Sequence, residues 1–216
     1  MDDRQALADE RDRARALSTA ELADAIEAIG FSCTRCGACC TAHDDEEHTA
    51  TVFPDEVRTL QTNTERSWND VARPMPYGIS EAGGETFEWA LQTTGCGDCA
   101  FYTEDADGTG GCTVHEDRPL ICQTYPFSLA LSGTSQPLGE PVDGDGLLRA
   151  HECEGLGRSI DRDRALELAA TLKERAITEL TEAIELLERY EPANPPDRTV
   201  VVHDSEGAKR PDGTEL

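Results

Sequence analysis

The sequence predicts a small, helix-rich and loop-rich α+β fold built as a single domain. Its 216 residues are enough for one sizeable domain with extensions. Apolar residues recur every three or four positions in 18–30 and 159–190, which is typical of amphipathic helices. Short apolar runs between them are separated by turn-forming residues. We expect a domain over 18–190, a charged N-terminal helix or extension over 1–17, and a mobile acidic tail over 191–216.

The predicted helices carry recognisable boundary signals. Ser18 followed by Glu21 is the capping-box arrangement at the start of the first helix, and Gly30 supplies its C-terminal stop. The long second helix ends at the segment PANPP, because proline cannot continue a helix. The segment FPDEVRTLQ predicts a shorter helix with Pro54 in its first turn.

Strands are predicted in shorter segments of the chain. TFEWALQT, residues 86–93, alternates apolar and polar side chains, and PFSLALS, residues 126–132, is a second candidate. Residues 62–85 are rich in turn formers, so we interpret them as a loop or insertion. The acidic tail contains one apolar run, TVVVH.

The charge balance is strongly acidic. Asp and Glu number 44 against 19 Lys and Arg, which gives a net charge of -25, and the only lysines are Lys173 and Lys209. Such a composition is typical of a halophilic protein, because molar salt screens the self-repulsion of the folded chain. The chain has no basic stripe of the kind that neutralises phosphates, so we expect no nucleic-acid partner.

The opening residues are polar and lack the apolar region of a secretory signal. The sequence has no apolar run of about 18 residues, the length that spans a bilayer. We therefore expect a cytoplasmic protein without a membrane partner. Disulfides seldom persist in a reducing cytosol, which favours metal-binding or reactive thiols over a disulfide framework.

Nine cysteines lie between residues 33 and 153, and four of them fall within CTRCGACC. Cys33/Cys36 and Cys96/Cys99 each form a C-x2-C pair, a spacing that brings two sulfurs to one side of a tight turn. Glycines adjoin both pairs, as expected where backbone amides turn toward thiolates. We therefore expect a fold organised around a cysteine-ligated metal core.

The number and identity of the metal centres stay open at this point. Cys39 and Cys40 are adjacent, so their side chains diverge and need not bind one ion. Two four-coordinate centres would use the cysteines nearly completely, but a single centre with buried or redox-active extra thiols fits almost as well. The run C-x2-C-x2-C is shared with bacterial ferredoxins, whose continuation differs from the Cys40–Thr41 found here. Zinc, iron and an iron–sulfur cluster such as 4Fe–4S are all candidates.

Four sequence blocks then occur in a specific order: FSCTRCGACC, CAFY, GCTVHEDRPLICQTYPF and CEGLG. Together they resemble the YkgJ-type cysteine-cluster family, the zinc- or iron-chelating CxxCxxCC domain, over roughly residues 30–157. Cys96 lies outside the family pattern. The resemblance implies metal ligands at Cys33, Cys36, Cys39, Cys40, Cys99, Cys112, Cys122 and Cys153, with Arg118, Pro119, Pro126 and Phe127 as framework.

Three classes of function follow from these observations. The first is a metal-binding protein that chelates zinc or iron through thiolates, with an undefined physiological role and unknown protein partners. The second is an enzyme, either an Fe–S oxidoreductase or a protein methyltransferase similar to the flagellin methylases that some family members resemble. The third is a thiol–disulfide protein with Cys39 and Cys40 as its active pair. His115 and His151 are candidates for substitute ligands.

Overall fold

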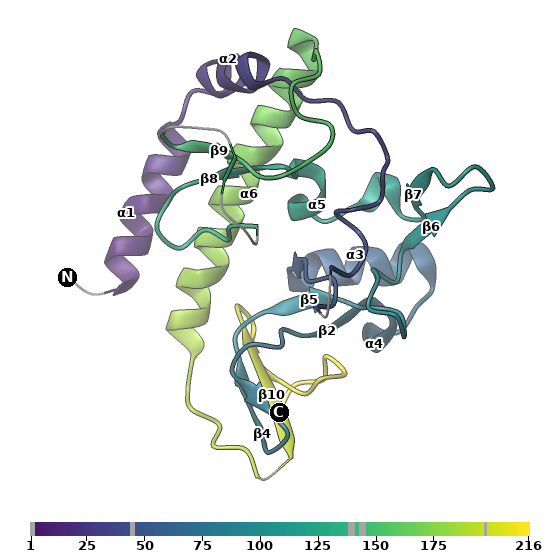
Figure 1. Cartoon of the computed structure of the whole chain (residues 1–216). Helices are drawn as coiled ribbons and strands as arrows, with labels where there is room; N and C mark the ends of the chain where they lie inside the picture. Colours follow the sequence, from purple (N-terminus) through teal and green to yellow (C-terminus); the bar gives the residue numbers. More distant parts are fainter. Residues whose placement is uncertain (1–2, 44–45, 138–140, 143–145, 197) are drawn as a thin grey trace. The chain divides into compact units, whose positions relative to one another are not determined.

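The computed structural model has a mixed α+β fold (Figure 1). It describes residues 3–43, 46–137, 141–142, 146–196 and 198–216. The chain divides into two compact units, each built from two separate segments. We call them the helical unit, Met1–Cys39 with Leu120–Thr181, and the sheet unit, Cys40–Pro119 with Glu182–Leu216. The chain passes between the units three times, and one of these passages lies between Cys39 and Cys40.

The helical unit contains the first predicted helix at its expected place. The hydroxyl oxygen of Ser18 accepts the backbone N–H of Glu21 at 3.3 Å, and Gly30, with φ of 79°, ends the helix by donating its N–H to Ile26 O at 2.8 Å. Strands β8 and β9 pair antiparallel. The elements of this unit are α1 (Asp3–Ala16), α2 (Thr19–Ile29), α5 (Leu120–Thr124), β8 (Phe127–Leu129), β9 (Leu148–Ala150) and α6 (Arg162–Arg189), the last of which continues into the sheet unit.

The core of the helical unit is apolar. The predicted helices do not enclose a thiol cluster; they pack with β8 and β9 through aliphatic side chains and the ring of Phe127. The predicted metal core is therefore not what fills the centre of this unit. The buried core residues are Ala14, Leu22, Ala23, Ile26, Phe127, Leu129, Leu131, Leu148, Ala150, Ala165, Leu168, Ala169, Leu172, Ala176 and Leu180.

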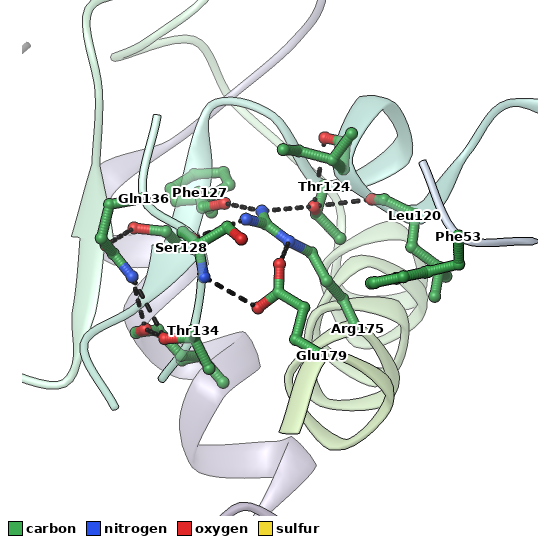
Figure 2. Close-up of polar contacts among 12 residues, drawn as sticks. Phe53, Leu120, Thr124, Phe127, Ser128, Thr134, Gln136, Arg175 and Glu179 are labelled. Carbon is green, nitrogen blue, oxygen red and sulfur yellow. Dashed lines mark hydrogen bonds and ion pairs between the residues drawn. The ribbon is translucent and has the colours of Figure 1, made fainter. Parts of the chain in front are cut away.

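A buried ion pair ties α6 to the β8 region (Figure 2). Arg175 Nε donates to Glu179 Oε1 at 2.8 Å, and both side chains are almost fully buried. The remaining guanidinium N–H groups donate to Thr124 Oγ1 at 3.1 Å, to Phe127 O at 3.3 Å and to Ser135 O at 2.7 Å. The backbone N–H of Ser135 donates to Glu179 Oε2 at 3.3 Å. This network satisfies both charges in a low-dielectric environment.

The sheet unit is built from short helices and strands. Its three sheets have the orders β1-β5-β2, β11-β10-β4-β3 and β6-β7, and β10 pairs with β4 in parallel. The elements are β1 (Thr51–Val52), α3 (Pro54–Thr64), α4 (Trp68–Val71), β2 (Ala72–Pro74), β3 (Ile79–Ser80), β4 (Gly83–Thr86), β5 (Trp89–Leu91), β6 (Tyr102–Glu104), β7 (Gly110–Cys112), η1 (His115–Asp117), β10 (Thr199–Asp204) and β11 (Gly207–Lys209).

Two tryptophans and a buried ion pair anchor the C-terminal strands in the sheet unit. Trp68 and Trp89 pack edge to face with ring centroids 5.0 Å apart. Trp89 Nε1 donates to Asp204 Oδ2 at 2.8 Å, and Lys209 Nζ lies 2.8 Å from the same oxygen. The Lys209 ammonium also lies 5.4 Å from the centroid of the Trp68 ring.

Two regions therefore differ from the sequence prediction. Residues 62–85, expected to be a loop or insertion, contain α4, β2, β3 and most of β4. The tail over 191–216, expected to be mobile, contains β10 and β11, and Val201, Val202 and His203 are buried there. The two regions are joined by the parallel pairing of β4 with β10, a long-range contact that local composition does not reveal, whereas β3–β4 and β10–β11 are local hairpins. In the residues that the structure describes, no helix is long and apolar enough to cross a membrane.

The Arg175–Glu179 pair gives a stability prediction. We expect Arg175→Met to lower the free energy of unfolding by about 3–5 kcal/mol, because Glu179 would stay buried without its cation. Adding Glu179→Met should recover most of this loss. Denaturant unfolding followed by circular dichroism measures both variants. Arg164→Met, in the exposed Arg164–Glu167 pair, is the matched control and should change stability by less than about 1 kcal/mol. An unchanged midpoint for Arg175→Met would contradict the assignment.

Candidate metal centre

A short antiparallel ladder in the helical unit brings two cysteine-bearing loops together. Phe31 and Leu156 form an antiparallel bridge, flanked by hydrogen bonds from Ser32 N to Gly155 O and from Gly157 N to Gly30 O, each 3.0 Å long. The loop that follows α2 and the loop that follows β9 therefore run side by side. Cys33 stands one residue after the first strand of this ladder, and Cys153 two residues before the second.

Glycine makes this close approach possible. A Cβ atom at Gly155 would lie 2.5 Å from the carbonyl oxygen of Ser32, and a Cβ atom at Gly30 would lie 2.6 Å from that of Arg158. Both clashing atoms belong to the backbone, so no flexible side chain can move aside to make room. The two cysteine loops can therefore lie against each other only if these positions have no side chain.

Backbone amides in both loops point at sulfur. The N–H of Arg35 donates to Cys33 Sγ at 3.4 Å, and the N–H of Gly155 donates to Cys153 Sγ at 3.4 Å. In the first loop the turn requires left-handed backbone at Arg35, with φ of 59°, and at Gly37, with φ of 83°. Such N–H groups stabilise negative charge on a thiolate and are typical of loops that present cysteines to a metal.

The electrostatics of Cys153 show which thiols lie near it. Burial is the main cause that raises the pKa of Cys153, and the Gly155 N–H opposes this rise. The charges of Cys39, Cys36 and Cys33 raise the pKa of Cys153 further. All four thiols belong to the helical unit, and the ladder brings the loops that carry Cys33 and Cys153 side by side.

Tyr125 lies against the same group of thiols. Its hydroxyl donates to the carbonyl oxygen of Glu152, and burial followed by the charges of Cys153 and Cys39 raises the pKa of Tyr125 to about 12. The backbone N–H of Tyr125 bonds to Ile121 O and so continues α5 by one residue. The half-buried Cys122 lies in α5, three residues before Tyr125.

The other four cysteines belong to the sheet unit. The N–H of Cys99 donates to Cys40 O at 2.9 Å, so these two residues are neighbours in space. The turn that carries Cys96 packs on the residues after Cys40, where Asp98 Oδ1 accepts the N–H of Ala42 at 2.8 Å. Cys96 Sγ donates to Asp98 Oδ2 at 3.4 Å.

The β6–β7 hairpin adds Cys112 to this group. Tyr102 donates its N–H to Cys99 O at 3.0 Å and stands opposite Cys112 in the ladder. Its hydroxyl donates to Glu104 at 2.7 Å, which is the main cause that raises the pKa of Tyr102 to about 12; the charges of Cys40 and Asp98 add to the effect. Cys99 and Cys112 are therefore backbone neighbours of Tyr102, and Cys99 in turn is hydrogen-bonded to Cys40.

The donor chemistry of both groups fits zinc or iron. All nine cysteines are in the part of the chain that the structure describes, and all are present as thiols without a disulfide. Soft thiolates are the ligands that zinc and iron–sulfur clusters use. Among the described residues, no three His, Cys, Asp or Glu side chains stand in a geometry that holds a metal ion. The backbone thus brings cysteine-bearing loops together. The described side chains of those loops do not stand in coordinating positions.

The remaining residues singled out in the sequence have the following partners in the structure. His115 is exposed and its Nδ1 lies 3.1 Å from Glu116. His151 is buried, with Nε2 placed 2.8 Å from Ser128 Oγ. Arg118 Nε donates to the carbonyl oxygen of His115 at 3.0 Å. Sequence reasoning missed Tyr125, which stands in TYPF, and the packing role of the first glycine of CEGLG.

Comparison with protein families identifies the family of this chain. Residues 32–154, more than half of the chain, match the family model described as "CxxCxxCC: Putative zinc- or iron-chelating domain". The matched range begins next to Cys33 and ends just after Cys153, so it spans both groups of thiols. No curated protein and no solved structure matches the chain. The chain belongs to the CxxCxxCC family of zinc- or iron-chelating cysteine-cluster domains.

Proposed function

We propose that the protein binds zinc or iron through cysteine thiolates and acts as a metal-chelating protein. The observation that carries this proposal is the ladder between 30–32 and 155–157, which places two cysteine loops together although more than 100 residues separate them. Both loops direct a backbone N–H at a cysteine sulfur. The proposed ligands are Cys33, Cys36, Cys39, Cys40, Cys99, Cys112, Cys122 and Cys153.

The residues around the thiols have separate tasks in this proposal. The amides of Arg35 and Gly155 stabilise thiolate charge, and Tyr125 covers one side of the thiols that it contacts electrostatically. Binding would require the thiol side chains to turn toward one ion, since no three of the described side chains stand in a coordinating geometry. A bound zinc ion would cross-link the loops, and an iron centre would add redox chemistry.

Metal content tests the proposal directly. We expect the full-length chain, purified without oxygen and in high salt, to contain stoichiometric zinc or iron by elemental analysis. A colourless protein with zinc would indicate a structural or chelating site. A brown protein with iron and acid-labile sulfide would indicate an Fe–S centre.

Cys36→Ser should lose metal and melt at a lower temperature, because the ion cross-links loops that are otherwise held by few contacts. The far-ultraviolet circular dichroism of α1, α2 and α6 should survive, since the apolar core of the helical unit contains none of the thiols. A variant with full metal content and an unchanged melting temperature would refute the role of Cys36.

The ladder supplies a second test that leaves every thiol in place. Gly155→Ala should weaken zinc binding by about 10–100-fold, because the new Cβ would collide with Ser32 O and move the N–H that bonds to Cys153. Competition with a chromophoric zinc chelator measures the change. Gly95→Ala is the matched control: a Cβ there meets nothing within 4 Å, although the residue adjoins Cys96. Equal zinc affinities for the two variants would show that the ladder does not position the ligands.

A further inference from the structure

We propose that the protein has two separate metal centres, one in each compact unit, and that the division between them falls between Cys39 and Cys40. This inference rests on the proposed function and assigns the thiols to each centre. The first centre belongs to the helical unit and draws on the thiols around Cys153. The second belongs to the sheet unit and uses Cys40, Cys99 and Cys112, with Cys96 as its fourth ligand.

The unit boundary supports the division. Cys39 ends the first segment of the helical unit, and Cys40 begins the sheet unit. The backbone contacts agree with this assignment: the N–H of Cys99 donates to Cys40 O at 2.9 Å within the sheet unit, and the ladder joins the Cys33 and Cys153 loops within the helical unit. Adjacent side chains diverge, so a pair of neighbouring cysteines is well suited to serve two different ions.

The number of thiols in the sheet unit supports a role for Cys96. Cys40, Cys99 and Cys112 leave a tetrahedral ion one ligand short. Cys96 shares a C-x2-C turn with Cys99, and that turn is fixed on the Cys40 segment by the bond from Ala42 N to Asp98 Oδ1. Gly97, with φ of 87°, lets the turn approach closely, since a Cβ there would lie 3.1 Å from Ala42 Cβ.

A cation also stands beside this second group. The Arg66 guanidinium lies 4.7 Å from the centroid of the Phe101 ring, and its Nη1 donates to Ala100 O at 3.4 Å. Both contacts are within two residues of Cys99. Four thiolates on one zinc ion leave a charge of about −2, which a neighbouring guanidinium offsets. The net charge of the chain, -25, makes such local compensation valuable.

Zinc counting on the full-length chain tests the division. We would load the wild type and variants with Zn²⁺ alone, without oxygen, and count bound ions by native mass spectrometry. We expect two zinc ions in the wild type, one in Cys36→Ser, one in Cys99→Ser and none in the double variant. Cys96→Ser should keep the ion of the helical unit and lose the other.

Each alternative outcome has a distinct meaning. One zinc ion in the wild type, or loss of all zinc in Cys36→Ser alone, would overturn the two-centre proposal while preserving metal binding. No zinc in the wild type would refute the proposed function itself. Full zinc content in Cys96→Ser would overturn the assignment of Cys96. If Cys99→Ser does not fold, the wild-type ion count still decides between one centre and two, and Gly155→Ala reports on the helical unit separately.

Discussion

The close approach of two backbone segments, 30–32 and 155–157, is the constraint on which the cysteine arrangement of the helical unit depends. Three conditions produce it: a bridge between Phe31 and Leu156, two hydrogen bonds beside that bridge, and glycine where a Cβ would meet a carbonyl oxygen. The ladder is short, so it contributes little stability by itself. The position of the ladder is set by the elements that precede its two strands. Helix α2 precedes one strand and β9 precedes the other, and α2 and β9 both pack in the apolar core.

Electrostatics then explains why these loops need backbone N–H groups that donate to the cysteine sulfurs. Thiolates that converge repel one another, and burial disfavours their charged form, as the raised pKa of Cys153 shows. The chain as a whole is strongly acidic, with a net charge of -25. Backbone N–H groups at Arg35 and Gly155 supply positive partial charge without adding a side chain. Arg66 supplies a full charge near Cys99 in the other unit.

Local features of the fold could be predicted from the sequence, and features that depend on distant partners could not. Helix α2 was predicted because its two caps, Ser18 and Gly30, bond to backbone groups only a few residues away. The long α6 was predicted because its apolar residues recur at regular intervals. The pairing of β10 with β4 joins residues more than 100 positions apart and leaves no periodic signal. Gly155 looks like an ordinary turn residue until Ser32 is known to be its neighbour. For the candidate site, the spacing of the motifs indicated thiol ligands and the family. Which thiols lie in the same unit became known only from the structure.

The apolar core of the helical unit bears on what a bound metal can do. A small metal-dependent domain unfolds without its ion because it has little else to bury. Here α1, α2 and α6 bury aliphatic side chains against β8 and β9, and the buried Arg175–Glu179 pair connects α6 to α5, β8 and Ser135, all without a thiol. The cysteines 33, 36 and 39 are exposed at the edge of this scaffold. An ion held there could be taken up or released while the core stays folded. The apolar scaffold of the helical unit is therefore physically separate from its cysteine loops.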